Sequence, residues 1–292
     1  MKIIDGALAR RLVDSQFPSW AALPLTVVSP GGSDHTIYRL GPDLSVRFPR
    51  HEGAIGQAAK ELEWLPRLAP HLPLAVPSPV GVGRPDFGYP WPWAVSRWLP
   101  GSVATVVELG SSLPVALSLA AFLTALQSIP APASLSLAGE PLSSRDRRVR
   151  SDIAAVAGVF DAAAMTSVWE AALASSPWDR PPVWYHGDFH TGNLLTVDGQ
   201  VSAVIDFGGL GVGDPACDLM MAFTLMDPAP RAAFRAALPL DEATWVRGRG
   251  ISLAAGLSAY TAYAATNPRV AEATTRQIAA ALATEPARPE SP

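Results

Sequence analysis

Four hydrogen-bonding side chains crowd into one short stretch of the chain, residues 184–195 (WYHGDFHTGNLL). They are His186, Asp188, His190 and Asn193, and apolar residues flank them on both sides. Such a set could hold a metal ion, combine a nucleophile with its base, form a phosphoryl-transfer loop, or make a polar turn between two strands. The spacing of the four residues and the types of their neighbours distinguish these possibilities.

Two of these chemistries lack the residues that they need. A zinc site needs a closed set of ligands, and His186 and His190 have neither a nearby cysteine nor a His-Glu-x-x-His helix. The glycines at positions 187 and 192 also disfavour a helix that would align two ligands. A serine nucleophile typically lies in a Gly-x-Ser-x-Gly turn, which this sequence does not contain. Zinc-dependent and acyl hydrolysis are therefore disfavoured.

Phosphoryl transfer needs a carboxylate near the reacting hydroxyl and an amide oxygen about five residues later that can hold magnesium. Asp188 and Asn193 have this spacing. A second magnesium carboxylate should follow on a nearby strand, and Asp206 ends the alternating run in VSAVIDFGG. A hairpin that turns at Asp198 and Gly199 would bring Asn193 and Asp206 together.

The composition is that of an ordinary globular protein. The chain has 292 residues, 49% of them hydrophobic, and a net charge of −4 without a basic stripe. We therefore expect no nucleic-acid partner and no membrane span. Cys217 is the single cysteine, which excludes an intrachain disulfide and favours a cytoplasmic location. The first residues lack the order of charges that is typical of a signal peptide.

The first third of the chain is predicted to be rich in strands. Short β-type runs surround a glycine pair over residues 25–48, and apolar and polar residues alternate over 44–48. Residues 52–65 have the apolar spacing of a helix, which Pro66 should end. Residues 94–98 are predicted to form a short strand.

The remainder of the chain is predicted to be mostly helical, after a boundary near residues 97–102. Asp214 and Pro215 have the residue types of a helix N-cap and of the first helical position. The final segment, 285–292, has the composition of a solvated tail. Helices are expected near residues 114–128, 145–175, 214–226, 228–237, 241–265 and 268–284.

Three motifs, taken in order, resemble the aminoglycoside phosphotransferase family. They are His186-Gly187-Asp188 with Asn193, then Ile205-Asp206-Phe207-Gly208, then Gly213-Asp214-Pro215 with Asp218. The resemblance covers nearly the whole chain and is thinnest over 102–180 and after 227. It implies an α+β, two-lobed protein-kinase-like fold with a β-rich N-lobe and a mostly helical C-lobe. The expected nucleotide-binding lobe is 1–98, and the catalytic and acceptor-binding lobe is 99–284.

The resemblance also implies roles for the residues of the crowded loop. Asp188 corresponds to the catalytic aspartate, and Asn193 and Asp206 correspond to magnesium ligands. His186 resembles a structural brace before the catalytic aspartate. At His190, a variable position, both a substrate contact and a solvated loop histidine are open, and the second is favoured. The carboxylates of two further residues resemble braces of the loop or caps of the next helix, namely Asp214 and Asp218.

The nucleotide end is marked less clearly. Gly31, Gly32 and Ser33 resemble the loop that covers the phosphates, although a plain glycine hairpin fits them almost as well. In the kinase-like fold the nucleotide base bonds to the backbone of the strand that joins the lobes, here Ser96, Arg97 and Trp98. The tryptophans of this region, 91, 93 and 98, are expected to be packing residues rather than base-stacking ones.

Arg47 stands where the family usually has a lysine that holds the α- and β-phosphates. Its partner should be a glutamate of the next helix, Glu61 or Glu63; helical spacing does not choose between them, and the family pattern favours Glu61. Lys60 is a competing candidate for the phosphate clamp. The arginine leaves open a pseudokinase-like module that binds nucleotide without turnover.

The implied activity is transfer of the γ-phosphoryl group of ATP or GTP, with Mg²⁺, to a hydroxyl of a small molecule. An antibiotic acceptor (an aminoglycoside, a macrolide or a related compound) and a small metabolite both fit, and the protein could be a monomer or a dimer. Residues 131–180 and the helices after 227 are expected to line the acceptor pocket. Acids and arginines are mixed over these segments, which favours a neutral or singly charged acceptor.

Overall fold

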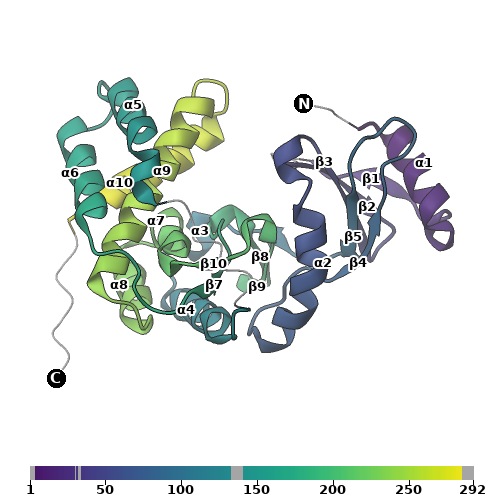
Figure 1. The fold of residues 1–292 in the computed structure, drawn as a ribbon, viewed down its shortest axis with the longest axis horizontal. Helices are drawn as coiled ribbons and strands as arrows, with labels where there is room; N and C mark the ends of the chain where they lie inside the picture. The colour runs from purple at the N-terminus through teal and green to yellow at the C-terminus, as the bar shows by residue number, and fades with distance from the viewer. Residues whose placement is uncertain (1–3, 30, 32–33, 133–140, 285–292) are drawn as a thin grey trace.

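The structure is a computed structural model of the chain, in which residues 4–29, 31, 34–132 and 141–284 are described. Two lobes lie side by side, with helix α2 (Gln57–Leu68) between them (Figure 1). The predicted order, a β-rich lobe followed by a mostly helical one, is confirmed. Among the described residues, no helix is both long enough and apolar enough to span a membrane.

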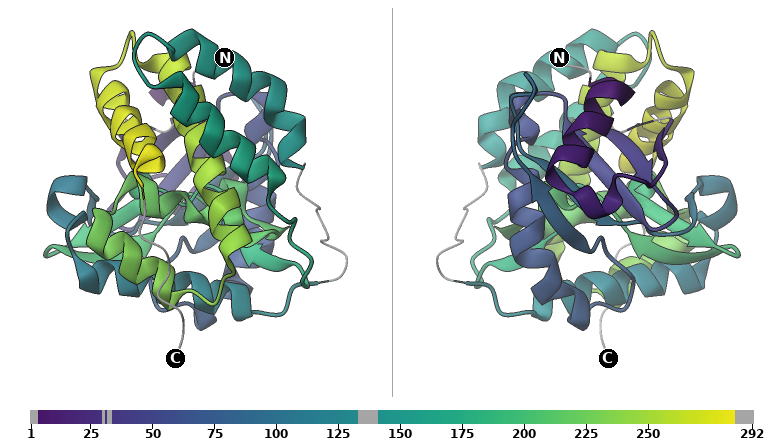
Figure 2. Two further views of the ribbon diagram at one scale, coloured as in Figure 1. Left: turned by 90° about the vertical axis from the view of Figure 1, so that its left-hand side faces the viewer. Right: turned by 90° about the vertical axis from the view of Figure 1, so that its right-hand side faces the viewer.

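A five-stranded antiparallel sheet forms the first lobe. Helix α1 (Gly6–Gln16) packs on it, as Figure 2 shows from the side of this lobe. The sequence analysis missed α1, although Asp5 caps it by accepting the N–H of Leu8 at 2.8 Å. The strands lie in the order β1 (Leu25–Val27), β2 (His35–Leu40), β3 (Leu44–Pro49), β5 (Trp93–Arg97) and β4 (Pro79–Gly83).

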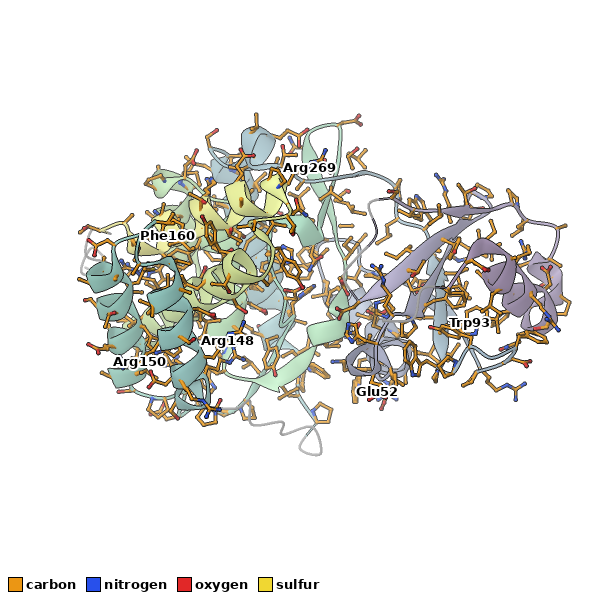
Figure 3. All side chains as sticks on the ribbon, turned by 90° about the horizontal axis from the view of Figure 1, so that it is seen from above. Glu52, Trp93, Arg148, Arg150, Phe160 and Arg269 are labelled. Carbon is orange, nitrogen blue, oxygen red and sulfur yellow. The ribbon has the colours of Figure 1, made fainter. Side chains whose placement is uncertain are left out.

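Aromatic rings fill the core of the first lobe. Trp93, labelled in Figure 3, is fully buried, and its ring centroid lies 4.9 Å from that of Phe48 and 5.5 Å from that of Phe17. Gly83 lies so close to the Trp93 ring that a Cβ atom there would be 1.9 Å from Cε2. Trp93 is therefore a packing residue, as expected.

Helix α2 continues past Pro66, so the prediction that this proline ends the helix is wrong. The helix follows a short turn, η2 (Glu52–Ala54), and runs to Leu68. Pro66 removes one backbone hydrogen bond. However, Leu65 and Leu68 are buried in the core of the second lobe, and their burial offsets this loss.

The chain just after α2 ties the two lobes together. Ala75 forms a parallel bridge with Ala203 in strand β9 (Gln200–Val204). The N–H of Val204 donates to the Ala75 carbonyl at 2.9 Å, and the N–H of Ala75 donates to the Ser202 carbonyl at 3.2 Å. Residues that precede position 98 thus contribute to the second core. The division at 98 and 99 remains a prediction about where the chain crosses between lobes.

The second lobe is built mainly from helices (Figure 2). The expected helix over 145–175 is two helices, because Gly158 follows the first and Asp161 caps the second, accepting the N–H of Ala163 at 2.9 Å. The segment after Asp214 begins as a 3₁₀ helix, η8 (Pro215–Leu219), before α7. The helices are α3 (Val106–Leu109), α4 (Leu113–Ser128), α5 (Asp146–Val156), α6 (Ala162–Ala174), α7 (Met220–Thr224), α8 (Pro228–Ala237), α9 (Glu242–Tyr263) and α10 (Pro268–Leu282).

Two small sheets carry the crowded loop and Asp206. Strand β7 (Val183–Tyr185) pairs with β10 (Gly211–Gly213), and β8 (Leu194–Val197) pairs with both β9 and β6 (Ser102–Val103). The predicted hairpin is present, since Val197 pairs with Gln200. Its turn residues, Asp198 and Gly199, have φ values of 51° and 73°, the left-handed values that a two-residue turn requires.

Candidate active site

Asp218 holds the loop that leads into Asp188. Its side chain is fully buried in η8, where Oδ2 accepts the N–H of His186 at 2.7 Å and Oδ1 accepts the N–H of Gly187 at 2.8 Å. Burial raises the pKa of Asp218 to about 7, against the lowering effect of these two hydrogen bonds. The carboxyl group therefore braces the loop, in line with the expected role.

His186 links this loop to the strand end that precedes Asp206. Its Nδ1 accepts the N–H of Asp188 at 3.2 Å, so the ring proton is on Nε2, which donates to the Ile205 carbonyl at 3.0 Å. The ring is fully buried, and this burial lowers the pKa of His186 to about 4. The neutral ring thus acts as a brace between the two loops, as the sequence suggested.

Two glycines let the loops approach each other backbone to backbone. Gly187 has a φ of 84°, and a Cβ atom on it would lie 2.2 Å from the Gly209 carbonyl oxygen. A Cβ atom on Gly209 would in turn lie 2.9 Å from the Gly187 carbonyl carbon. Both positions therefore require glycine, and the contact brings together the backbone segments that carry Asp188 and Asp206.

Asp188 is oriented by Asn193 and His190. Asn193 Nδ2 donates to the Asp188 carbonyl at 2.9 Å and to Oδ2 at 3.0 Å, and His190 Nε2 lies 3.4 Å from the same Oδ2. Burial raises the pKa of Asp188, but the hydrogen bond and charge of His190 and the other neighbours bring it below its ordinary value. The side chain is 49% exposed, so Asp188 is an accessible carboxylate at neutral pH.

His190, for which the sequence analysis favoured a solvated loop histidine, is partly exposed and lies beside Asp188. Its Nδ1 accepts the N–H of Gly192 at 3.0 Å, so Nε2 of the neutral ring carries a proton and faces Asp188 as a donor. The sequence shows that the residues are near one another, but it does not show which way the ring turns. A contact between His190 and substrate stays a prediction.

Arg47 on β3 joins two carboxylates. Its Nη1 lies 2.9 Å from each oxygen of Glu61, and its Nη2 lies 3.0 Å from Asp206 Oδ1. Glu63 is exposed on the same helix, so Arg47 pairs with Glu61, the residue that the family pattern favoured. Burial opposes the charged form, but the two carboxylates raise the pKa of Arg47, and the guanidinium stays cationic.

Asp206 and Asn193 lie on adjacent backbone segments, because the N–H of Ile205 donates to the Asn193 carbonyl at 2.9 Å. Asp206 has left-handed backbone angles, φ 65° and ψ 66°, which are uncommon outside glycine. Its side chain is 38% exposed. One amide and one carboxylate oxygen suit Mg²⁺, which takes hard oxygen ligands and shares them with substrate phosphates.

Lys60 contacts the backbone that follows Asp206. Its Nζ donates to the Gly208 carbonyl at 2.6 Å and to the Leu210 carbonyl at 2.8 Å. Burial of the ammonium lowers the pKa of Lys60, while the charge of Glu61 opposes that change. No local sequence pattern signals these contacts, because they join residues that are far apart in the chain.

The predicted phosphate loop lies only in part within the described residues. Gly31 is described, in the connection between β1 and β2, whereas Gly32 and Ser33 are outside the described residues. The residue that follows, Asp34, accepts a hydrogen bond from Gln57 Nε2 at 3.0 Å. Helix α2 is thereby joined to the end of this connection.

Two backbone N–H groups at the end of the strand that joins the lobes already donate hydrogen bonds within the protein. The N–H of Arg97 donates to the Ser78 carbonyl and that of Trp98 to the Asp43 carbonyl, each at 2.8 Å. The Ser96 side chain is buried, and among the described residues its Oγ has no hydrogen-bond partner. Recognition of the nucleotide base at Ser96 and Trp98 stays a prediction, and the N–H of Trp98 would have to leave Asp43 to take part.

Asp214 joins the start of η8 to helix α9. Its Oδ1 accepts the N–H of Ala216 at 3.0 Å at the start of η8, and its Oδ2 accepts a hydrogen bond from Arg247 Nε at 2.7 Å. Arg247 is buried on α9 and also donates to the Ser176 carbonyl. Sequence reasoning missed this arginine, because no local pattern links it to Asp214.

His35, at the start of β2, offers a test of the electrostatics beside Arg47. It is 4% exposed, and burial together with the charge of Arg47 lowers the pKa of His35 from 6.5 to about 4. As the pH falls below 6.5, His35 therefore becomes protonated in the unfolded chain but stays neutral in the folded chain. Between pH 7 and 4 we expect the free energy of unfolding of the wild type to fall by about 3 kcal/mol relative to His35→Gln.

Urea unfolding of the wild type and of His35→Gln across this pH range measures the difference in their free energies of unfolding. The contribution of Asp218 to the pH dependence cancels because both proteins contain it. Replacement of the exposed His71 by Gln is the matched control and should leave the wild-type pH dependence unchanged. Parallel curves for the wild type and His35→Gln would contradict the account of a buried, neutral His35.

Residues 25–251 match the family described as the phosphotransferase enzyme family. No curated protein matches the chain. The solved structures to which it is similar include the GDP complex of wild-type aminoglycoside 2'-phosphotransferase-IIIa, at 17% identity and a TM-score of 0.76, covering 95% of this chain and 99% of that one. Another is the GDP and kanamycin complex of APH(2")-IIia, at 18% identity and a TM-score of 0.74, covering 93% and 97%.

The macrolide 2'-phosphotransferase MphH from Brachybacterium faecium is also similar, at 25% identity and a TM-score of 0.61, covering 92% of this chain and 98% of that one. The likeness extends over both lobes, and the family match includes all three motifs between residues 186 and 218. The chain therefore belongs to the phosphotransferase enzyme family and has the two-lobed, kinase-like fold of these solved structures.

Proposed function

We propose that this phosphotransferase moves the γ-phosphoryl group of ATP or GTP to a hydroxyl of a small molecule. The observation that carries the proposal is the convergence of Asp188, Asn193 and Asp206 beside the ion pair of Arg47 and Glu61. The GDP and ADP complexes among the similar structures support a nucleotide co-substrate. The single cysteine also supports a cytoplasmic location.

In this proposal Asp188 orients the acceptor hydroxyl and takes its proton. The hydroxyl oxygen forms a bond to the γ-phosphorus while the bond to the β,γ-bridging oxygen breaks, and nucleoside diphosphate leaves. Since the surroundings of Asp188 lower its pKa, the carboxylate acts mainly by holding the hydroxyl in line. Asn193 and His190 keep the carboxylate in place for this step.

The proposed phosphate-binding residues surround this carboxylate. Asn193 and Asp206 would hold Mg²⁺, which when bound neutralises charge on the phosphates. In this proposal Arg47 holds the α- and β-phosphates, and Glu61, which accepts two hydrogen bonds from it, keeps the guanidinium oriented. The remaining nucleotide contacts that we propose come from Gly31, Gly32, Ser33, Ser96 and Trp98.

A pseudokinase-like module without turnover is the alternative, because Arg47 replaces the usual lysine. The arrangement around Asp188 favours turnover, since the carboxylate is held by two neighbours and is still exposed. Arginine also keeps the positive charge beside the phosphates. A metabolite kinase with the same chemistry is the second alternative, and it differs only in the acceptor.

We infer that the acceptor is an antibiotic with little positive charge, such as a macrolide. The similar structures include both macrolide and aminoglycoside phosphotransferases. In the helical lobe of this chain, however, arginines already neutralise many carboxylates, as for Arg148 and Arg150 on α5 (Figure 3). The pairs are Asp146–Arg150, Asp152–Arg148, Glu170–Arg150, Asp214–Arg247, Asp227–Arg276, Asp241–Arg180 and Glu242–Arg235.

The role of Asp188 can be tested by replacing it with Asn. Turnover should fall by roughly 10²- to 10⁴-fold, the rate enhancement that a positioned base usually contributes. Folding and nucleotide binding should stay nearly intact. Asp206→Ala should instead weaken binding of the magnesium nucleotide. Steady-state kinetics and nucleotide titrations measure both effects, with exposed Asp179→Asn as the control. Full activity of Asp188→Asn would contradict the assignment.

The acceptor inference predicts a preference between two antibiotic classes. Each ammonium of a polycation must find a carboxylate partner, and those named above are already paired. We expect kcat/KM for a macrolide to exceed that for kanamycin, with coupled nucleoside-diphosphate release as the assay. A micromolar KM for kanamycin that rises steeply with salt would show that free carboxylates do line the pocket.

A further inference from the structure

We propose that Lys60 is a positioning residue that holds Asp206 in its metal-binding orientation through the backbone of Gly208 and Leu210. Its ammonium donates to both carbonyls, at 2.6 and 2.8 Å. This proposal rests on the proposed function in one respect, that Asp206 binds magnesium together with the nucleotide. It differs from the idea that Lys60 itself clamps the phosphates.

The segment that Lys60 holds is a single short turn closed by one backbone hydrogen bond, from the N–H of Leu210 to the Phe207 carbonyl. The backbone of Asp206 is left-handed, a strained conformation for a residue with a side chain. The single turn η7 (Phe207–Gly209) follows, and it contains two glycines with many accessible backbone conformations. External contacts must therefore select the observed conformation.

Charge-assisted hydrogen bonds can supply this selection. Lys60 is partly buried, so its ammonium has lost part of its water and needs acceptors in the protein. The Gly208 and Leu210 carbonyls lie on either side of Gly209, the residue that contacts Gly187 of the catalytic loop. One ammonium group thus fixes the turn on both sides of the contact between the two loops.

Helix α2 gives Lys60 a rigid support. Gln57, Lys60 and Glu61 have the i, i+3, i+4 spacing of one helix face. Gln57 donates to Asp34 at 3.0 Å, and Glu61 accepts from Arg47 at 2.9 Å. The same face of one helix therefore holds the end of the β1–β2 connection, the arginine and the turn after Asp206.

Nucleotide binding with and without magnesium distinguishes positioning from clamping. Titrations with a fluorescent nucleoside diphosphate are made in EDTA and in saturating Mg²⁺, for the wild type, Lys60→Met and Arg47→Ala. In EDTA, Lys60→Met should bind within about twofold of the wild type, whereas its Mg²⁺-dependent gain in affinity should fall by about tenfold, the value of one charged hydrogen bond. Arg47→Ala should bind more weakly in both conditions.

A second variant and a second readout keep the proposal testable without activity. Lys60→Gln retains donors but no charge, so it should recover part of the Mg²⁺-dependent gain in affinity. Amide hydrogen exchange of the nucleotide-free protein should speed up over residues 207–211 in Lys60→Met, while α2 stays protected.

Two results would overturn the proposal. One is a loss of affinity in EDTA for Lys60→Met as large as that for Arg47→Ala, which would identify a clamp. The other is unchanged exchange over residues 207–211 in the nucleotide-free variant, which would mean that Lys60 does not order the turn. If the wild type binds no nucleotide, the proposed function fails, while the exchange experiment still decides whether Lys60 orders the turn.

Discussion

The Arg47 guanidinium, held between Glu61 and Asp206, is the interaction on which the rest of the site depends. Its side chain is only 12% exposed and that of Glu61 only 1%, so the charges interact with little screening by water. Removal of one partner would leave an uncompensated charge in the interior, which is strongly unfavourable. Because Arg47 lies on β3, Glu61 on α2 and Asp206 just after β9, the contact between Arg47 and Asp206 links the first lobe to the second.

In the second lobe, buried side chains and two glycines fix the backbone of the loops that carry Asp188 and Asp206. Asp218 fixes the turn before Asp188, His186 connects that turn to Ile205, and Gly187 and Gly209 let the two loops touch. None of these groups needs to react. They hold the backbone so that Asp188 stays exposed and oriented, which is how a positioned carboxylate contributes to phosphoryl transfer.

The parts of the site whose residues lie close together in the chain could be predicted from the sequence. The spacing of Asp188 and Asn193, and the turn residues that fold Asp206 back toward them, are local patterns. Contacts between distant segments leave no such pattern, so the carbonyls held by Lys60 and the bond from Arg247 to Asp214 appeared only in the structure. Pro66 should end a helix by local rules, but α2 continues beyond it because the burial of Leu65 and Leu68 stabilises the last turn.

Steady-state kinetics of Arg47→Ala and Arg47→Lys under saturating Mg²⁺ test the central claim most directly, with the nucleotide as the varied substrate. Loss of a desolvated cation beside the phosphates should lower kcat/KM by roughly 30- to 1,000-fold in Arg47→Ala. Arg47→Lys should restore part of that loss, since the charge returns while the two-pronged geometry does not. Near-normal KM and kcat in Arg47→Ala would contradict the claim that this arginine organises the nucleotide site.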